Sequence, residues 1–473
     1  MNLSTRSSAV WAACTQITQQ GSLFVLVPFL SRYLNPTEFG IIAIVQIVIQ
    51  FGNLLCDFGT GAAVTREPEL TERFYSTSMW INFCVGLALT AILIQISSPL
   101  AALLGDEDSA ASSALALVAV QFVFLSALIS PQAVFRREMK FRAIFIIETL
   151  GAAIYVGFSI FFMSKRMGVE SIIISQIFSA GFKSLLYICG SSISFRFECD
   201  RIAFARVIGF SAGLGGFNLI NFWARRADQI LIAHAIGQGA LGIYSMAYRI
   251  MMLPLTNITY AISAVMLPGL APFRTDSVRL KTEVLRWFKI ISLLTFPMMS
   301  FLWLGRNQLV TVFLGEKWRD VSELIAYFSV VGLVQSVIAP VGVIYTLTGK
   351  TKLFFLVGCI NTAVVLLSFL VGIKDGILGL ACLYLIANII MIPLNVGSAM
   401  RLISASIADW LSSISGALTV FMILVPFHFV IENMPDIYAI LVSGVLVLTF
   451  NGIYLWWFER SLIKSIVRIP SET

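Results

Sequence analysis

Residues 376–400 read GILGLACLYLIANIIMIPLNVGSAM, a run without a single charged side chain. A segment needs about 20 mostly apolar residues to cross the hydrocarbon core of a bilayer as a helix. Segments of this kind recur along the whole chain and predict about 14 transmembrane helices. The alternating pattern of membrane strands is missing, so the predicted fold class is all-α integral membrane. The spans are expected at roughly 8–31, 38–60, 76–98, 112–134, 142–163, 169–190, 207–235, 241–266, 284–305, 322–348, 352–371, 376–400, 408–430 and 437–458.

Composition agrees with a bilayer as the solvent. Of the 473 residues, 58% are hydrophobic and 12% are charged, against about 45–50% and about 25% in ordinary soluble domains. These values exclude a soluble enzyme, a disordered chain and a nucleic-acid-binding module, although the net charge is +7. The seven cysteines form no CxxC pair and there are two histidines, so the sequence predicts neither a metal site nor a cofactor.

The distribution of Lys and Arg predicts the orientation in the membrane. Most basic residues lie on one side, in the N-terminal segment, the C-terminal segment and the loops that follow even-numbered spans. The loop with Arg136, Arg137, Lys140 and Arg142 is the clearest example. Because short cytoplasmic loops carry the excess of basic residues, both termini are expected in the cytoplasm and the protein in a bacterial inner membrane.

An internal repeat indicates how the helices are grouped. Phe39-Gly40-Ile41 and Leu241-Gly242-Ile243 each open a predicted helix after a tight turn, and the same shift lays Gln16 and Gln19 on Asn218 and Asn221. Repeats of this kind build many transporters. We expect two parallel lobes of about six helices each, at 1–200 and 201–405, followed by a helix pair and a cytoplasmic tail at 406–473.

Ionisable residues inside predicted spans mark the candidate site, because each costs about 2.5–3.5 kcal/mol at the bilayer centre. Glu148 and Lys183 lie at matched depth on neighbouring helices and are predicted to form an ion pair. The remaining residues of this kind are Asp57, Arg225, Arg226, Asp228 and Arg249. Asp228 and Arg249 also lie at similar depth, which leaves a surplus of positive charge on the seventh and eighth spans. Polar side chains also join membrane helices structurally, at about 0.6 kcal/mol each, and that alternative stays open.

Helical spacing places several polar side chains on common faces. Gln46, Gln50, Asn53 and Asp57 share one face of the second span. The seventh span carries a similar stripe, with Asn218, Asn221, Arg225 and Asp228 as members, and the first span has Gln16 and Gln19. These faces would line one hydrated cavity. Guanidinium groups suit phosphate and carboxylate oxygens, so we expect an anionic ligand there.

Three motifs carry a resemblance to a known family. The stretch from Leu30 to Gly40 reads LSRYLNPTEFG, the loop from Phe135 to Phe141 reads FRREMKF, and Ala247-Tyr248-Arg249 follows Leu241-Gly242-Ile243-Tyr244. In this order and spacing they resemble the Wzx-type bacterial polysaccharide transporters, in the branch of the colanic-acid and succinoglycan exporters. These belong to the multidrug/oligosaccharidyl-lipid/polysaccharide (MOP) exporter superfamily, and the resemblance covers nearly the whole chain.

The resemblance implies a flippase in which two lobes alternate around a cationic cavity. Its substrate would be an undecaprenyl-pyrophosphate-linked oligosaccharide destined for exopolysaccharide or lipopolysaccharide, with membrane lipids, a polymerase and chain-length machinery as partners. Arg225, Arg226 and Arg249 would engage the pyrophosphate or acidic sugars. Asp57 or Asp228 would take part in proton or sodium coupling. Lipid II flippases carry arginines in the first helix, where this chain has Gln16 and Gln19, which favours a polysaccharide unit over lipid II.

Two other functions remain open at this point. A cation-coupled multidrug extruder of the same superfamily would favour an acidic cavity over the arginine surplus. A membrane-embedded polysaccharide polymerase or ligase would present a large outer loop with catalytic Arg and His, and the predicted outer loops are short. We therefore predict a transporter without catalytic residues.

Overall fold

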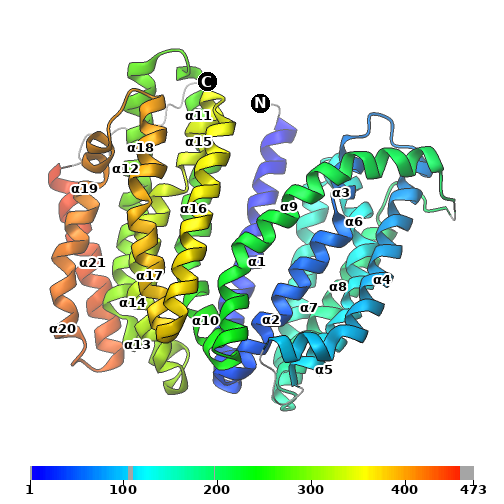
Figure 1. Ribbon diagram of the computed structural model, residues 1–473, viewed down its shortest axis with the longest axis horizontal. Coiled ribbons are helices and arrows are strands. Elements are labelled where there is room, and N and C mark those ends of the chain that lie inside the picture. The colour runs from blue at the N-terminus through cyan, green and yellow to red at the C-terminus, as the bar shows by residue number, and fades with distance from the viewer. Residues whose placement is uncertain (1–2, 105–109, 197, 459–473) are drawn as a thin grey trace. The chain divides into compact units, whose positions relative to one another are not determined.

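The computed structural model describes residues 3–104, 110–196 and 198–458, and every element in these ranges is helical (Figure 1). The chain divides into two compact units, Met1–Gly242 and Ile243–Thr473. The predicted all-α membrane fold is confirmed. The boundary between the units comes later than the predicted lobe boundary at residue 200, and the division into lobes by the repeat stays a prediction.

Eleven stretches of the described residues are long and apolar enough to cross a membrane. One of them, Thr351–Leu402, has 52 residues and would be about 78 Å long as a single helix, far beyond the roughly 30 Å hydrocarbon core. It is broken by a short 3₁₀ turn, and the helices on either side pack against each other. The long helices at the start of the chain and after residue 200 are not among the eleven. The number of 14 spans stays a prediction.

The first unit is built mainly from long helices, with a few short ones between them. Its elements are α1 (Leu3–Tyr33), α2 (Pro36–Asp57), α3 (Thr60–Arg66), α4 (Glu72–Leu103), α5 (Ala110–Ala119), α6 (Gln121–Arg137), α7 (Phe141–Ser164), α8 (Val169–Cys189), α9 (Arg201–Ala235) and the first turn of α10 (Gln238–Pro254). The short α3 was not predicted, because seven residues are too few to show an apolar period. It follows a break in the helix at Phe58 and Gly59, which both have left-handed backbone conformations.

The N-terminal ends of α2 and α10 correspond to each other in the repeat, and the structure brings them together within the first unit. A Cβ atom added to Gly40 would overlap the carbonyl oxygen of Gln238, and one added to Gly242 would overlap the carbonyl oxygen of Pro36. The same sequence spacing separates Pro36 from Gln238 and Gly40 from Gly242. The contact is therefore reciprocal: Gly40 lies against Gln238, and its equivalent Gly242 lies against Pro36, which is the equivalent of Gln238. Both positions require the absence of a side chain.

The connection between α8 and α9 anchors α9 on the first unit. The backbone N–H of Arg196 donates to Ser76 Oγ, and that of Asp200 donates to Thr77 Oγ1, each over 2.9 Å. Arg196 also forms an ion pair with Glu72 at 2.6 Å. Because α9 then packs on α2, α3 and α4, the whole of the predicted seventh span, 207–235, belongs to the first compact unit.

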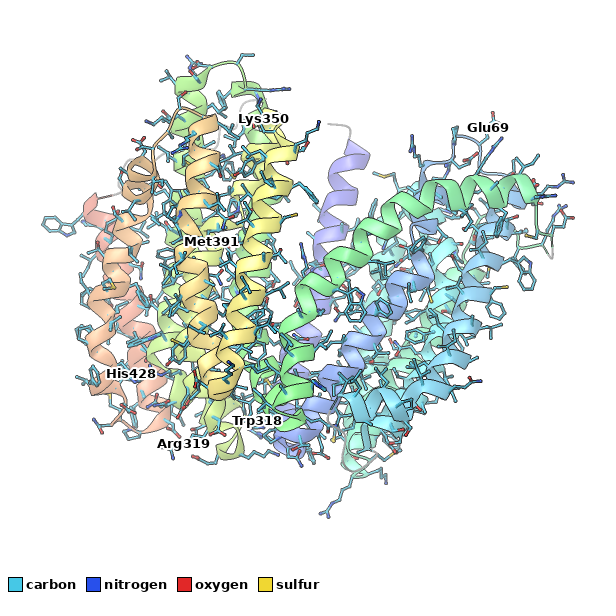
Figure 2. All side chains as sticks on the ribbon, in the orientation of Figure 1. Glu69, Trp318, Arg319, Lys350, Met391 and His428 are labelled. Carbon is cyan, nitrogen blue, oxygen red and sulfur yellow. The ribbon has the colours of Figure 1, made fainter. Side chains whose placement is uncertain are left out.

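The second unit continues α10 and completes the chain. Its elements are the π-helical turn η1 (Leu255–Thr259), α11 (Tyr260–Leu270), η2 (Ala271–Phe273), α12 (Ser277–Leu304), α13 (Arg306–Phe313), η3 (Glu316–Trp318), α14 (Arg319–Ile338), α15 (Val341–Thr348), α16 (Thr351–Gly372), η4 (Ile373–Asp375), α17 (Gly376–Ile390), α18 (Ile392–Leu402), α19 (Ile407–Leu424), η5 (Val425–Phe427), α20 (His428–Ile431) and α21 (Asp436–Phe458). Trp318 is fully buried beside the start of α14, and Met391 marks the break between α17 and α18 (Figure 2). Pro254 precedes the π turn that interrupts the predicted span 241–266.

Candidate functional site

The most complete polar group of the first unit surrounds Glu148 on α7, whose exposed fraction is 7%. Its Oε1 accepts hydrogen bonds from Gln132 Nε2 at 3.2 Å and from the Tyr187 hydroxyl at 3.1 Å. Its Oε2 accepts from Gln19 Nε2 at 3.1 Å and from Lys183 Nζ at 3.2 Å. We call these five residues the Glu148 hub. It joins α1, α6, α7 and α8 through one carboxylate.

Neighbouring residues hold the donors of the Glu148 hub in place. Gly151 lies one turn after the carboxylate, and a Cβ atom there would collide with the Lys183 stem. Ser179 donates to the Gly151 carbonyl oxygen at 2.8 Å, which closes α7 on α8. Arg136 Nη2 donates to Gln132 Oε1 at 3.0 Å, so the amide NH₂ of Gln132 is left to point at the carboxylate.

The structure thus places Lys183 against Glu148, but it adds partners that the sequence did not reveal. Gln132 and Tyr187 were missed because an amide and a tyrosine near a helix end are usual at membrane interfaces. Gln19 was predicted to bind the substrate, and here its amide donates to Glu148. Gln16 is exposed on α1.

Asp57 belongs to a different group of polar side chains. Its Oδ1 accepts from the Gly61 N–H at 2.8 Å and lies 3.4 Å from Thr60 Oγ1, at the start of α3. The Thr60 hydroxyl also donates to Asn82 Oδ1 at 2.7 Å, and Asn82 Nδ2 donates to Ser130 Oγ at 3.1 Å. These contacts connect α2 and α3 with α4 and α6. They give Asp57 a structural task in addition to the one predicted for it.

Arg226 and Arg225 are neighbours on α9 with different surroundings. Arg226 Nη1 donates to Gln229 Oε1 at 3.2 Å, and Arg226 Nη2 donates to Gln50 Oε1 on α2. Arg225 is exposed, and no side chain in the described part of the first unit pairs with it. Asp228, one turn further along, is 7% exposed.

The other predicted members of the site are only partly covered by the structure. Asn218 is half-buried on α9, and the side chain of Asn221 lies outside the described residues. Arg249 is half-buried on the part of α10 that belongs to the second unit. Gln50 was placed on the polar face of the second span, and its contact with Arg226 shows one place where that face meets α9.

The second unit has polar contacts of its own between helices. Gln335 Nε2 on α14 donates to the Tyr384 hydroxyl on α17 at 2.6 Å. Asn395 Nδ2 on α18 donates to Asn361 Oδ1 on α16 at 3.0 Å. Uncharged side chains of this kind stand out little in a hydropathy profile, and sequence reasoning did not select them.

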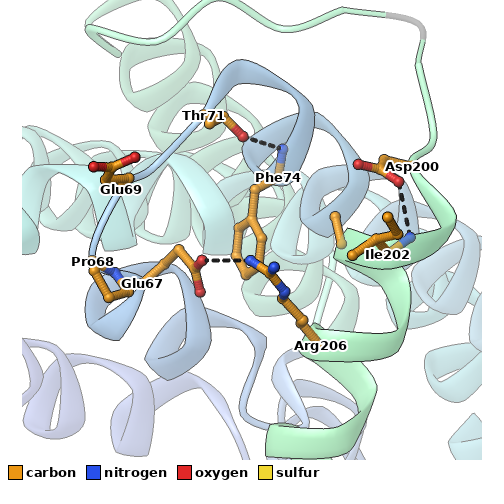
Figure 3. A pocket seen from close by; sticks show the side chains of 9 residues that line it. Glu67, Pro68, Glu69, Thr71, Phe74, Asp200, Ile202 and Arg206 are labelled. Carbon is orange, nitrogen blue, oxygen red and sulfur yellow. Dashed lines mark hydrogen bonds and ion pairs between the residues drawn. The ribbon is translucent and has the colours of Figure 1, made fainter.

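A cavity of about 500 Å³ lies at the N-terminal ends of α4 and α9 (Figure 3). Glu67 and Arg206 form an ion pair across it at 3.3 Å. The Asp200 carboxylate accepts from the Ile202 N–H at 2.8 Å, and Thr71 Oγ1 accepts from the Phe74 N–H at 3.2 Å. These groups cap helices and anchor α9, and none of the predicted site residues lines the cavity.

Relatives identified by sequence are proteins of polysaccharide biosynthesis. The lipopolysaccharide biosynthesis protein WzxC of Escherichia coli (strain K12) is 22% identical over 391 residues, which are 82% of this chain and 79% of the relative. The teichuronic acid biosynthesis protein TuaB of Bacillus subtilis (strain 168) is 24% identical over 74% of this chain and 72% of its own. The succinoglycan biosynthesis transport protein ExoT of Rhizobium meliloti (strain 1021) is 27% identical over 65% of this chain and 62% of its own.

Solved structures show the same fold. The lipid II flippase MurJ in an inward closed conformation superposes with a TM-score of 0.76 at 16% identity, covering 96% of this chain and all of that one. An inward-facing multidrug resistance MATE family transporter of the MOP superfamily gives a TM-score of 0.66 at 15% identity, covering 84% and 98%. The family model described as polysaccharide biosynthesis protein matches residues 29–323. The predicted resemblance is thereby confirmed, and the chain belongs to this family of polysaccharide biosynthesis proteins.

Proposed function

We propose that this protein is a flippase for undecaprenyl-pyrophosphate-linked oligosaccharide units in a bacterial inner membrane. It turns the units outward for the synthesis of exopolysaccharide or lipopolysaccharide. The family match over residues 29–323 carries the proposal. The names of the relatives and the fold shared with a lipid II flippase support it. The chain moves its substrate and leaves the covalent bonds of the substrate unchanged.

Basic side chains on α9 and α10 would receive the pyrophosphate. Arg225, Arg226 and Arg249 lie within predicted spans, where placing a charged side chain costs about 2.5–3.5 kcal/mol at the bilayer centre. A doubly charged pyrophosphate group offsets that cost and accepts the guanidinium fork through two oxygens. Two lobes that alternate between inward and outward access would carry this cationic surface from one side of the membrane to the other.

Coupling ions, membrane lipids and partner proteins would act together with the protein during transport. Asp57 or Asp228 would couple transport to protons or sodium, and no cofactor takes part. Both termini lie in the cytoplasm. Membrane lipids surround the protein, and a polymerase with its chain-length machinery would receive the exported unit on the outer side.

A complementation experiment tests the function. In a strain that lacks this gene, the lipid-linked unit should accumulate on the cytoplasmic side, and the intact gene should restore surface polymer. We expect a variant with Arg225→Ala to reach normal abundance in the membrane without restoring export, because the anion loses its arginine partner. Normal surface polymer in cells with this variant would contradict the cationic site.

A multidrug extruder is the second candidate, because the MATE transporters share the fold. It predicts that deletion of the gene lowers the resistance of cells to cationic drugs and leaves the surface polymer unchanged. The surplus of arginines on α9 and α10 disfavours cationic substrates. Measuring drug susceptibility and surface polymer in the same deletion strain separates the two functions.

A further inference from the structure

We propose that the two adjacent arginines of α9 have different tasks. Arg225 receives the anionic group of the substrate, whereas Arg226 is a positioning residue that holds this part of α9 on α2. The inference rests on the proposed function and names the residue that meets the substrate. The sequence alone treats the two arginines as equivalent.

The hydrogen bonds of Arg226 are the first observation. One terminal nitrogen donates to Gln229 Oε1 at 3.2 Å, and the other donates to Gln50 Oε1 across the contact with α2. Gln229 is itself 7% exposed, so this end of the guanidinium group is held by a buried amide. Each terminal nitrogen of Arg226 therefore donates one of its two N–H groups to a protein oxygen, so both arms of the fork are directed at the protein.

Aromatic packing next to these bonds fixes the rotation of α9. Phe51 follows Gln50 on α2, and its ring centre lies 5.4 Å from that of Phe222 and 5.2 Å from that of Trp223. Contacts on successive residues of α2 thus hold one face of α9. Neighbouring residues of a helix point about 100° apart, so the packing that directs Arg226 toward α2 directs Arg225 away from this contact.

The surroundings of Arg225 complete the argument. Its side chain is exposed, and no residue in the described ranges of the first unit forms an ion pair with it. It lies on the polar stripe of α9, about two turns after Asn218, which is half-buried. A guanidinium group at membrane depth needs water or an anion. Arg225 has its full fork available for one, and Arg226 does not.

The experiment uses the full-length protein in lipid nanodiscs, with undecaprenyl pyrophosphate as the probe and undecaprenol as the uncharged control. Binding and the melting temperature are measured on each variant. We expect Arg225→Gln to weaken binding of the pyrophosphate about tenfold to a hundredfold, since a charge-assisted hydrogen-bonded contact is lost. Its melting temperature should stay unchanged. Arg225→Lys should bind with intermediate affinity, because it keeps the charge and loses the fork.

Arg226→Gln should instead lower the melting temperature, and with it the affinity for undecaprenyl pyrophosphate. Both quantities should recover when the side chains at positions 226 and 50 are exchanged. The exchange combines Arg226→Gln with Gln50→Arg and so restores an arginine–glutamine hydrogen bond between α9 and α2. No comparable exchange should rescue Arg225→Gln. Arg319→Gln, which removes another exposed arginine outside the predicted spans, serves as the matched control and should change neither quantity.

The outcomes separate this inference from the proposed function. If the unmodified protein binds undecaprenol as well as undecaprenyl pyrophosphate, the proposed function fails and the inference fails with it. If the unmodified protein selects the pyrophosphate and Arg225→Gln and Arg225→Lys select it equally well, only the inference is overturned. Loss of binding in Arg226→Gln at an unchanged melting temperature would also overturn it, because Arg226 would then be the ligand.

Discussion

The carboxylate of Glu148 accepts four hydrogen bonds, which is about as many as its lone pairs allow. The ion pair with Lys183 could be predicted from the positions of the two residues along neighbouring spans, because opposite charges inside a membrane stabilise each other. The direction of Gln132 depends on Arg136 from the next turn, a contact that spacing alone does not select. The charged half of the Glu148 hub was predictable, and the uncharged half was not.

Replacing Glu148 should destabilise the first unit, since Lys183 would remain largely buried without its partner. We expect Glu148→Gln to lower the free energy of unfolding by about 1–3 kcal/mol. The double variant Glu148→Gln with Lys183→Met should recover part of the loss, because no uncompensated charge is left. Unfolding of the purified protein in detergent measures both values. Equal losses in the single and the double variant would contradict the ion pair as the cause.

A loop arginine shows the same limit of sequence reasoning. Arg137 was part of the basic loop that predicts orientation, and its charge there needed no specific contact. In the structure its guanidinium group donates to the carbonyl oxygens at the C-terminal end of α3, including that of Pro68 at 2.9 Å. Since α3 itself was too short to predict, its arginine cap could not be predicted either.

At the scale of helices, the apolar period located most spans, while the breaks inside them depended on local chemistry. α2 begins as expected, because Asn35 and Glu38 form a capping box before the apolar run. The π turn after Pro254 and the break at Met391 interrupt segments that are continuous by hydropathy. Hydropathy measures how apolar a segment is and carries little information about its hydrogen-bond register.

The contact between α2 and α10 predicts a strong response to small side chains. Gly242→Ala should lower the free energy of unfolding by about 1–3 kcal/mol, because its methyl group would overlap the Pro36 carbonyl oxygen and force the two helices apart. Gly358 on α16 has open space around it, and Gly358→Ala should be neutral or stabilising by up to about 1 kcal/mol. Thermal unfolding compares the two. A similar response in both variants would contradict the close approach.

At the scale of the whole molecule, the orientation is a prediction from the basic loops alone, and single-cysteine labelling can check it. Glu69 and Lys374 are both exposed and are predicted to lie on opposite sides of the membrane. In a background without the seven native cysteines, a membrane-impermeant maleimide should label Lys374→Cys in intact cells. Glu69→Cys should react only after the membrane is permeabilised. The reverse pattern would invert the topology.

The reciprocal placement of Gly40 and Gly242 has a consequence for how the gene can change. In a two-fold interface between identical chains, each contact between two residues occurs twice, once with the two chains exchanged. The contacts of Gly40 and Gly242 follow this pattern within one polypeptide. Most positions of the two predicted repeats carry different residues, but a side chain gained by either glycine would overlap the backbone of the other repeat. The two halves therefore continue to constrain each other at this point.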